Sequence, residues 1–328
     1  MTSPSLDIVA IGDAIVDVIA TTDDAFIAER GLPKGGMQLL TTEQADDLYA
    51  AMGPAREISG GSAANSMAGA AALGLDVAFI GQVANDQLGE IFAHDMVSLA
   101  VRFETPPLAP PPPTGRCLIL VTPDAQRTMN TCPGASHELT SVSLDAELIR
   151  SASVTFLEGY LWGPERPRAA MLEAGRIAHS AGRTVAFTLS ESLCIGDRKA
   201  GVRGMIEAGT ADILFGNEDE VRHLTGCSAL VDCLALLSKH VRTIVITRGA
   251  RGAIAVEPAE QVEIAAAPVA RIVDTTGAGD LFAAGFLAGR CRGRSLKGCL
   301  ETGAAAAAEV ISHFGARPEA DLKALAGL

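Results

Sequence analysis

The chain has 328 residues, 48% of them hydrophobic, and its 39 acidic and 26 basic side chains give a net charge of −13. This hydrophobic content excludes an intrinsically disordered chain, and the length suits one large α/β domain or two smaller ones. The negative charge argues against nonspecific binding to nucleic acid or to anionic membranes, so any phosphate must be bound at a local site.

No targeting segment or cysteine framework is apparent. The first five residues lack the basic and apolar regions of a signal peptide, and no apolar run reaches the about 18 residues of a membrane span. The seven cysteines are scattered without a CxxC pair, which favours neither disulfides nor a zinc site. We therefore expect a cytoplasmic monomer or homodimer that contacts no membrane and no nucleic acid.

The first predicted element is a short strand followed by two acidic residues. Residues 6–12, LDIVAIG, form an apolar run that ends in glycine, which is typical of a central strand in a parallel sheet. Ligands of open α/β sheets collect beyond the carboxyl ends of the strands, so Asp17 is a candidate for holding substrate hydroxyls. Asp17 lies in an apolar run, where an acid needs a partner. Asp13 is better explained as a solvated loop carboxylate.

Glycines next introduce a helix. After a predicted strand at 35–40 and a helix at 43–52, residues 58–66, ISGGSAANS, form a glycine turn that leads into a helix over 67–73. Ala64 stands where a GxSxG nucleophile elbow requires glycine, which excludes an acyl-transfer serine. Asn65 either caps the helix or hydrogen-bonds a ligand hydroxyl.

Several predicted strands lack crossover helices. A proline-rich connector at 106–113 precedes a hairpin over residues 114–131. With the segments at 14–22 and 35–40, this hairpin predicts a separate small antiparallel sheet that acts as a lid over an α/β site.

From residue 154 strands and helices alternate. The strands are predicted at 154–157, 185–189, 213–215 and 243–247, and the helices between them at 165–180, 199–208 and 230–239. This order predicts an α/β fold with a doubly wound, mostly parallel sheet flanked by helices. Its strand ends carry Glu158, Asn217 and Thr247 at the edge where sites form. Gly249 and Gly252 then either admit a flat or phosphorylated ligand or form a plain turn.

The most informative stretch is DTTGAGD at 274–280, followed by an apolar run at 281–288. Gly277 and Gly279 allow positive φ, so the turn and the following helix can direct N–H groups at one anion. Asp280 then lies where a base is needed if a hydroxyl attacks a phosphoryl group held there. An ordinary capped helix start explains the local pattern equally well.

Two motifs together give the chain a resemblance to ribokinase-like (PfkB) carbohydrate and nucleoside kinases over essentially its whole length. They are GGSAANS at 60–66 and DTTGAGD at 274–280; between them, NEDE at 217–220 matches the family's NxxE element and 247–252 its nucleotide loop. No Walker A sequence is present. The resemblance implies a single ribokinase-like kinase domain over residues 1–328, with lid strands inserted at 14–22, 35–40 and 114–131.

The resemblance implies roles on the acceptor side of the site. Asp280 removes the proton from a CH2OH group. The N–H groups that stabilise the transferring phosphoryl group come from Gly277, Ala278 and Gly279. Substrate hydroxyls are held by Asp17, Gly61 and Asn65, with Glu158 as a further candidate.

It also implies roles on the nucleotide side, where ATP and Mg2+ bind. Asn217 and Glu220 act near Mg2+, Glu220 through water, and the nucleotide is lined by Thr247, Gly249 and Gly252. Asp274 and Thr276 match positions that hold a monovalent cation in some members. The surroundings of that site, at 313–315, match poorly, which disfavours K+ activation.

The acceptor is less closely defined. Ser62 and Ser66 resemble adenosine kinase-like members, whereas ribokinases usually carry a lysine at the position of Ser62 and an asparagine at that of Ile15. The DTTGAGD form is common in sugar kinases. Candidates for stacking a nucleobase, any of which can instead be core, are Phe103, Phe156, Tyr160, Trp162 and Phe187. We expect transfer from ATP to adenosine, giving AMP and ADP. The alternative is a sugar kinase for fructose, 2-keto-3-deoxygluconate or a related sugar, and a kinase-like binding protein without turnover is less favoured.

Overall fold

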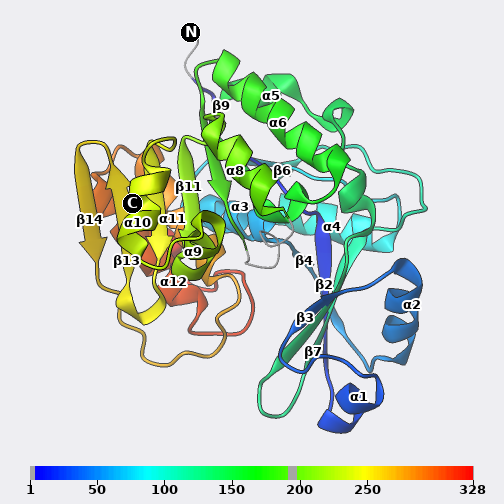
Figure 1. Ribbon diagram of the computed structural model, residues 1–328. Helices are drawn as coiled ribbons and strands as arrows, with labels where there is room; N and C mark the ends of the chain where they lie inside the picture. Colours follow the sequence, from blue (N-terminus) through cyan, green and yellow to red (C-terminus); the bar gives the residue numbers. More distant parts are fainter. Residues whose placement is uncertain (1–3, 191–197, 328) are drawn as a thin grey trace.

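Two β-sheets organise the residues that the structure, a computed structural model, describes: 4–190 and 198–327. The larger sheet has the strand order β14-β13-β12-β11-β10-β9-β1-β5-β6 (Figure 1). Its strands are β1 Leu6–Ile11, β5 Val77–Ile80, β6 Val101–Phe103, β9 Ala152–Glu158, β10 Thr184–Thr188, β11 Ile213–Asn217, β12 Thr243–Thr247, β13 Ala253–Glu257 and β14 Glu260–Ile264. Neighbours from β6 to β12 pair in parallel, and β13 and β14 are antiparallel. The predicted doubly wound, mostly parallel sheet is confirmed.

Helices cover both faces of this sheet, and two further helices, α1 and α2, accompany the second sheet (Figure 1). The helices of the described residues are α1 Asp24–Glu29, α2 Thr42–Ala51, α3 Ser62–Ala72, α4 Gln87–Ser98, α5 Ala146–Ser151, α6 Glu165–Ser180, α8 Lys199–Glu207, α9 Glu218–Thr225, α10 Leu230–Leu237, α11 Ala278–Cys291, α12 Leu296–Val310 and α13 Leu322–Ala326. Successive side chains of a strand point to opposite faces. Ile8 and Ala10 of β1 therefore pack in a core with α3, α11 and α12, while Val9 and Ile11 pack in a second core with α5, α6 and α8.

The second sheet has the order β3-β8-β7-β2-β4 and projects to one side of the larger sheet together with α1 and α2 (Figure 1). Its strands are β2 Ile15–Thr21, β3 Met37–Leu39, β4 Arg56–Gly60, β7 Gly115–Val121 and β8 Arg127–Cys132. A small second sheet from these segments was expected, but an entirely antiparallel one is wrong, because β2–β7 and β3–β8 pair in parallel. Those partners are far apart in the chain, so no hairpin turn forces them to be antiparallel.

Some elements differ from the sequence-based expectation. Helix α3 begins at Ser62, directly after Gly61 at φ 93°, and not at residue 67. Its first turn is made of small residues without an apolar stripe, so the periodicity becomes visible only from Met67. The short elements β4, β6, α1, α5 and α9 were not expected. Within the described residues, no helix is both long and apolar enough to cross a membrane.

Candidate active site

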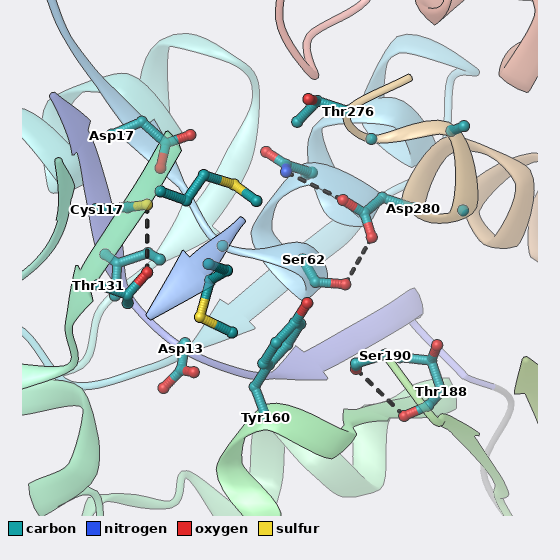
Figure 2. A pocket seen from close by; sticks show the side chains of 18 of the residues that line it. Asp13, Asp17, Ser62, Cys117, Thr131, Tyr160, Thr188, Ser190, Thr276 and Asp280 are labelled. Carbon is teal, nitrogen blue, oxygen red and sulfur yellow. Dashed lines mark hydrogen bonds between the residues drawn. The ribbon is translucent and has the colours of Figure 1, made fainter. Parts of the chain in front are cut away.

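A cavity of about 880 Å3 lies where the carboxyl ends of the large-sheet strands face the second sheet. Figure 2 shows Asp17 and Asp280 on opposite sides of it, with Ser62 beside Asp280. Most of the expected site residues line this cavity: Asp17, Gly61, Asn65, Asn217, Glu220, Thr247, Thr276, Gly277, Ala278, Gly279 and Asp280. Residues more than 200 positions apart are thus brought to one site, at the edge where open α/β sheets bind ligands.

Asp280 lies in the first turn of α11 and is held by two residues of α3. Ser62 Oγ donates to Asp280 Oδ1 at 2.6 Å, and Asn65 Nδ2 donates to Oδ2 at 3.1 Å. Burial raises the pKa of Asp280 to about 6, against the opposing effects of these hydrogen bonds and of the Arg317 charge. The carboxylate is therefore fixed in place and still ionised at neutral pH, as a general base must be.

The turn before α11 presents main-chain donors to the cavity. Gly277 has φ 78° and ψ −2°, and a Cβ on it would lie 2.6 Å from that of Ala316. Ala278 N donates to Thr275 O at 3.2 Å, whereas in the described chain the N–H groups of Gly277 and Gly279 have no main-chain acceptor. A Cβ on Gly279 would meet no atom within 4 Å, so a ligand can approach its backbone closely. The turn fits an anion at the helix N-terminus.

Asp17 reaches the cavity because β2 alternates. Val16 and Val18 are fully buried in the core, while Ile15 and Asp17 point to the other face and line the cavity. Burial raises the pKa of Asp17 to about 6, against the charges of Arg127 and Arg317. Its carboxylate has no hydrogen-bond partner among the described residues, and it is available to a donor such as a substrate hydroxyl.

Glu158 does not line the cavity, which corrects its assignment as a substrate contact. It is fully buried, and its two carboxylate oxygens accept the N–H groups of Asp13 and Ala63. Burial holds its pKa well above the ordinary value. Glu158 therefore links the turn after β1 to the start of α3 through hydrogen bonds.

Asp13, expected to be a solvated loop carboxylate, lines the cavity instead. Its side chain is 13% exposed, Ser136 Oγ donates to Asp13 Oδ1 at 2.8 Å, and His137 Nε2 lies 4.0 Å from the same oxygen. Ser136 and His137 come from a short 3₁₀ turn more than 120 residues away. The local sequence around Asp13 carried no signal of that partner.

At the nucleotide end, the NxxE motif forms a capping box. Asn217 Oδ1 accepts from Glu220 N, and Glu220 Oε2 accepts from Asn217 N, both at 2.8 Å. In the described part of the chain, no three His, Cys, Asp or Glu side chains are grouped to hold a metal. Mg2+ usually keeps several waters and takes one or two carboxylates plus substrate phosphates. Two oxygen-bearing side chains at the cavity fit an ion held partly by the nucleotide.

The glycines of the predicted nucleotide loop lie outside the cavity lining, beyond Thr247. They flank a short 3₁₀ turn, Gly249–Arg251. Gly252 has φ +85°, and a Cβ on it would lie 2.0 Å from Ile264 O. Turn geometry alone therefore accounts for Gly252, while Gly249 faces open space.

Protein donors occupy the Asp274 carboxylate, at the position that matches a monovalent-cation site in some family members. Asp274 Oδ1 accepts from Thr276 N at 3.0 Å and from Thr276 Oγ1 at 2.7 Å, and Oδ2 accepts from Gly315 N at 3.0 Å. Arg127 of β8 forms an ion pair with the same carboxylate. Burial alone would raise the pKa of Asp274, but these hydrogen bonds and the Arg127 charge bring it below the ordinary value. K+ does not fit here, because both oxygens are used and a guanidinium is in contact.

Of the five aromatic residues considered for stacking, only Tyr160 lines the cavity. The other four pack against aromatic neighbours elsewhere: Phe103, Phe156, Trp162 and Phe187.

Comparison with known proteins gives concordant matches. Residues 5–322 match the description "pfkB family carbohydrate kinase". The solved adenosine kinase of Sinorhizobium meliloti is 44% identical, with a TM-score of 0.91 over 97% of this chain and 98% of that one. A probable sugar kinase protein from Rhizobium etli CFN 42 is 40% identical, with a TM-score of 0.92 over 99% and 98%. A 5-dehydro-2-deoxygluconokinase from Shouchella clausii is 30% identical over 263 residues, 77% of this chain and 80% of the relative.

Proposed function

Since the chain belongs to the pfkB family of carbohydrate kinases and is a phosphotransferase that acts on an alcohol group, we propose that it phosphorylates a nucleoside, adenosine foremost, with ATP as donor. The resemblance read from the two glycine motifs is confirmed at the level of the family. The similarity to the Sinorhizobium meliloti adenosine kinase supports the choice of acceptor.

The observation that carries this proposal is the contrast between two walls of the cavity. The wall formed by the second sheet is largely apolar and includes Ile15, Met37, Leu39, Cys117, Ile119 and Met129. Asp17 is the acid on that wall, and Asn65 and Asp280 face it from the first turns of α3 and α11. A nucleoside matches this contrast, because its flat base covers apolar surface while its ribose meets carboxylate and amide groups. We assign Tyr160, which also lines the cavity, to contact with the base.

A sugar is the second candidate acceptor. It is favoured by similarity to the Rhizobium etli probable sugar kinase and to the Shouchella clausii 5-dehydro-2-deoxygluconokinase. A small polyol would leave much of the apolar wall uncovered, which weakens this alternative. A binding protein without turnover is disfavoured because Asp280 and the glycine turn, the residues that the proposal needs as base and anion site, both line the cavity.

In the proposed reaction, Asp280 accepts the proton of the acceptor CH2OH group while the hydroxyl oxygen of that group bonds to the γ-phosphorus of ATP. The bond from that phosphorus to the β,γ-bridging oxygen breaks, and ADP leaves. The N–H groups of the 277–279 turn stabilise the charge on the transferring phosphoryl group, and Asp17 and Asn65 hold the acceptor. Mg2+, bound near Asn217 and Glu220, would neutralise phosphate charge.

An acceptor screen tests the proposal. ADP release is followed with ATP and Mg2+ in the presence of adenosine, inosine, ribose, fructose, 2-keto-3-deoxygluconate or 5-dehydro-2-deoxygluconate. We expect the highest kcat/KM with adenosine. Turnover of a sugar without turnover of adenosine would replace the nucleoside with the sugar alternative, and no turnover of any acceptor would reject both.

A further inference from the structure

Arg317, in the loop between α12 and α13, has no part in the mechanism above, although it reaches the site from behind. Its guanidinium donates to Ala64 O at 2.9 Å, to Ser59 O at 2.7 Å and to Ser59 Oγ at 3.0 Å. Its Nε is buried without a partner. An arginine bonded to main-chain and hydroxyl oxygens keeps a positive charge that no contacting acid neutralises.

These contacts clamp the turn that carries the partners of Asp280. Ser59 lies near the end of β4 and Ala64 in the first turn of α3, on either side of Gly60 and Gly61. The residues that hold the Asp280 carboxylate, Ser62 and Asn65, lie at the start of the same helix. Displacement of the guanidinium would therefore loosen the hydrogen bonds that orient the base.

The position of the guanidinium also has an electrostatic consequence. Its charge lowers the pKa values of Asp17 and Asp280, both of which burial raises to about 6. Burial in turn lowers the pKa of Arg317 to about 10, opposed by the charges of Asp17, Asp280 and Asp95, so Arg317 remains charged at neutral pH.

Other charged groups that bear on these carboxylates come from several elements. Asp17 is influenced by Arg127 of β8, and Glu158 of β9 by Asp280. Asp95 of α4 accepts Ser59 N at 2.9 Å, and His94 Nδ1 lies 3.7 Å from Asp95. Arg317 is the positively charged group that lowers the pKa of Asp280, beside the hydrogen bonds from Ser62 and Asn65.

We propose that Arg317 is a positioning residue for phosphoryl transfer, which fixes the start of α3 through Ser59 and Ala64 and sets a permanent positive charge behind Asp280 and Asp17. This inference rests on the proposed function, because it assigns Arg317 to the base of that reaction. A purely structural arginine would affect folding and activity equally at every pH.

The test compares Arg317→Gln, which removes the charge, with Arg317→Lys, which keeps the charge but cannot make the forked contacts. The surface variant Arg176→Gln is the control, since Arg176 is 67% exposed. The kcat of each variant is measured against pH with the best acceptor. We expect Arg317→Gln to lose at least about tenfold in kcat at pH 7.5, and the acid limb of its pH–kcat profile to move up by about one pH unit. Arg317→Lys is expected to lower kcat while leaving the limb near its native position.

An acid limb at the native pH in folded Arg317→Gln would overturn the proposal. If Arg317→Gln does not fold, Arg317→Lys decides the question. A native kcat in Arg317→Lys, or an acid limb that moves up by about one pH unit although the charge is kept, would overturn the proposal.

A second readout needs no acceptor. The carboxyl carbon of Asp280, assigned with Asp280→Asn, is titrated by 13C NMR, and its pKa should rise from about 6 by roughly one unit in Arg317→Gln. An unchanged pKa contradicts the proposal. If the native protein phosphorylates none of the acceptors, the proposed function fails. The titration still tests whether the charge of Arg317 acts on the Asp280 carboxylate.

Discussion

Asp280 depends on neighbours that lie far from it in the chain. Ser62 and Asn65 hold its oxygens from α3, and Arg317 supplies positive charge from beyond α12. Burial without these groups would favour the protonated acid, which cannot act as a base. Burial raises the pKa of the carboxylate and makes it more basic, while the hydrogen bonds and the Arg317 charge keep it ionised at pH 7.

Removal of this base should abolish most of the turnover. We expect Asp280→Asn to lower kcat at least about a hundredfold, because the amide cannot take the hydroxyl proton. The control is Asp219→Asn, at a side chain that is 89% exposed on α9. Steady-state ADP release measures both variants, and near-native kcat in Asp280→Asn would overturn the assignment of the base.

The same substitution should not destabilise the protein at neutral pH. The pKa of Asp280 rises from an ordinary 3.8 to about 6 in the folded chain, so folding favours the protonated form. Its ionisation therefore costs stability progressively between about pH 4 and pH 6, and the full cost is present above pH 6. We expect the Tm of Asp280→Asn to equal or exceed the native Tm at pH 7.5. Near pH 4 the native Tm should rise relative to that of the variant, because the native carboxyl is then protonated. Calorimetry at both pH values checks this, and a larger loss at pH 7.5 than at pH 4 contradicts it.

The residues that the sequence revealed are those that belong to contiguous motifs. Asp280, Asn65 and Asn217 stand beside glycines or helix starts whose local chemistry is recognisable. Asp13 and Arg317 acquire their positions through contacts more than 120 and 250 residues away, and a single charged residue in a loop gives no sign of such a partner.

At the scale of elements, the turn before α3 is the most constrained connection in the site. Gly61 has φ +93°, and a Cβ there would lie 2.2 Å from Asp13 O. We expect Gly61→Ala to lower kcat/KM at least about a hundredfold, because the start of α3 must shift and carry Ser62 and Asn65 with it.

The matched control is Gly209→Ala. Gly209 has φ +71° but nothing within 4 Å of an added Cβ, so it carries the same kind of backbone strain without the collision. This variant should lose about 1 kcal/mol of stability and keep its activity. Thermal melts and kinetics separate the two effects, and equal activities of the two variants would show that the collision is unimportant.

A second contact between elements joins β8 to the turn before α11. Because Arg127 and main-chain donors saturate Asp274, we expect turnover to be the same in K+, Na+ and choline salts at equal ionic strength. Steady-state rates in the three salts test this. A severalfold increase specific to K+ would mean that a cation displaces part of this network.

Elements with an apolar run or strong periodicity were predictable, whereas β4, β6, α1, α5 and α9 were not. The parallel strands follow from short apolar runs that alternate with helical segments, and α6 spans the expected residues 165–180. Strand β4 was missed because ISGG looks like a glycine turn, although its pairing with β2 makes it an edge strand. The pairing of β2 with β7 joins segments a hundred residues apart, which no local pattern encodes.

At the scale of the whole molecule, the cavity exists because two sheets of different character face one another. The strand ends of the larger sheet bring polar groups, and one face of the second sheet brings apolar side chains. The single-domain organisation with an inserted lid remains a prediction. If the second sheet closes over the acceptor, small-angle X-ray scattering should show a smaller radius of gyration with adenosine and a non-hydrolysable ATP analogue than without ligands. An unchanged radius would argue against a lid.

In the proposed reaction, the CH2OH group of a nucleoside receives the γ-phosphoryl group at Asp280. The most direct test of this reaction is product analysis with ATP, Mg2+ and either adenosine or 5′-deoxyadenosine, which lacks the reacting hydroxyl. We expect AMP and an equal amount of ADP from adenosine, no phosphorylated product from 5′-deoxyadenosine, and loss of AMP formation in Asp280→Asn. Absence of AMP with the native protein, or equal phosphorylation of the deoxy analogue, would contradict it.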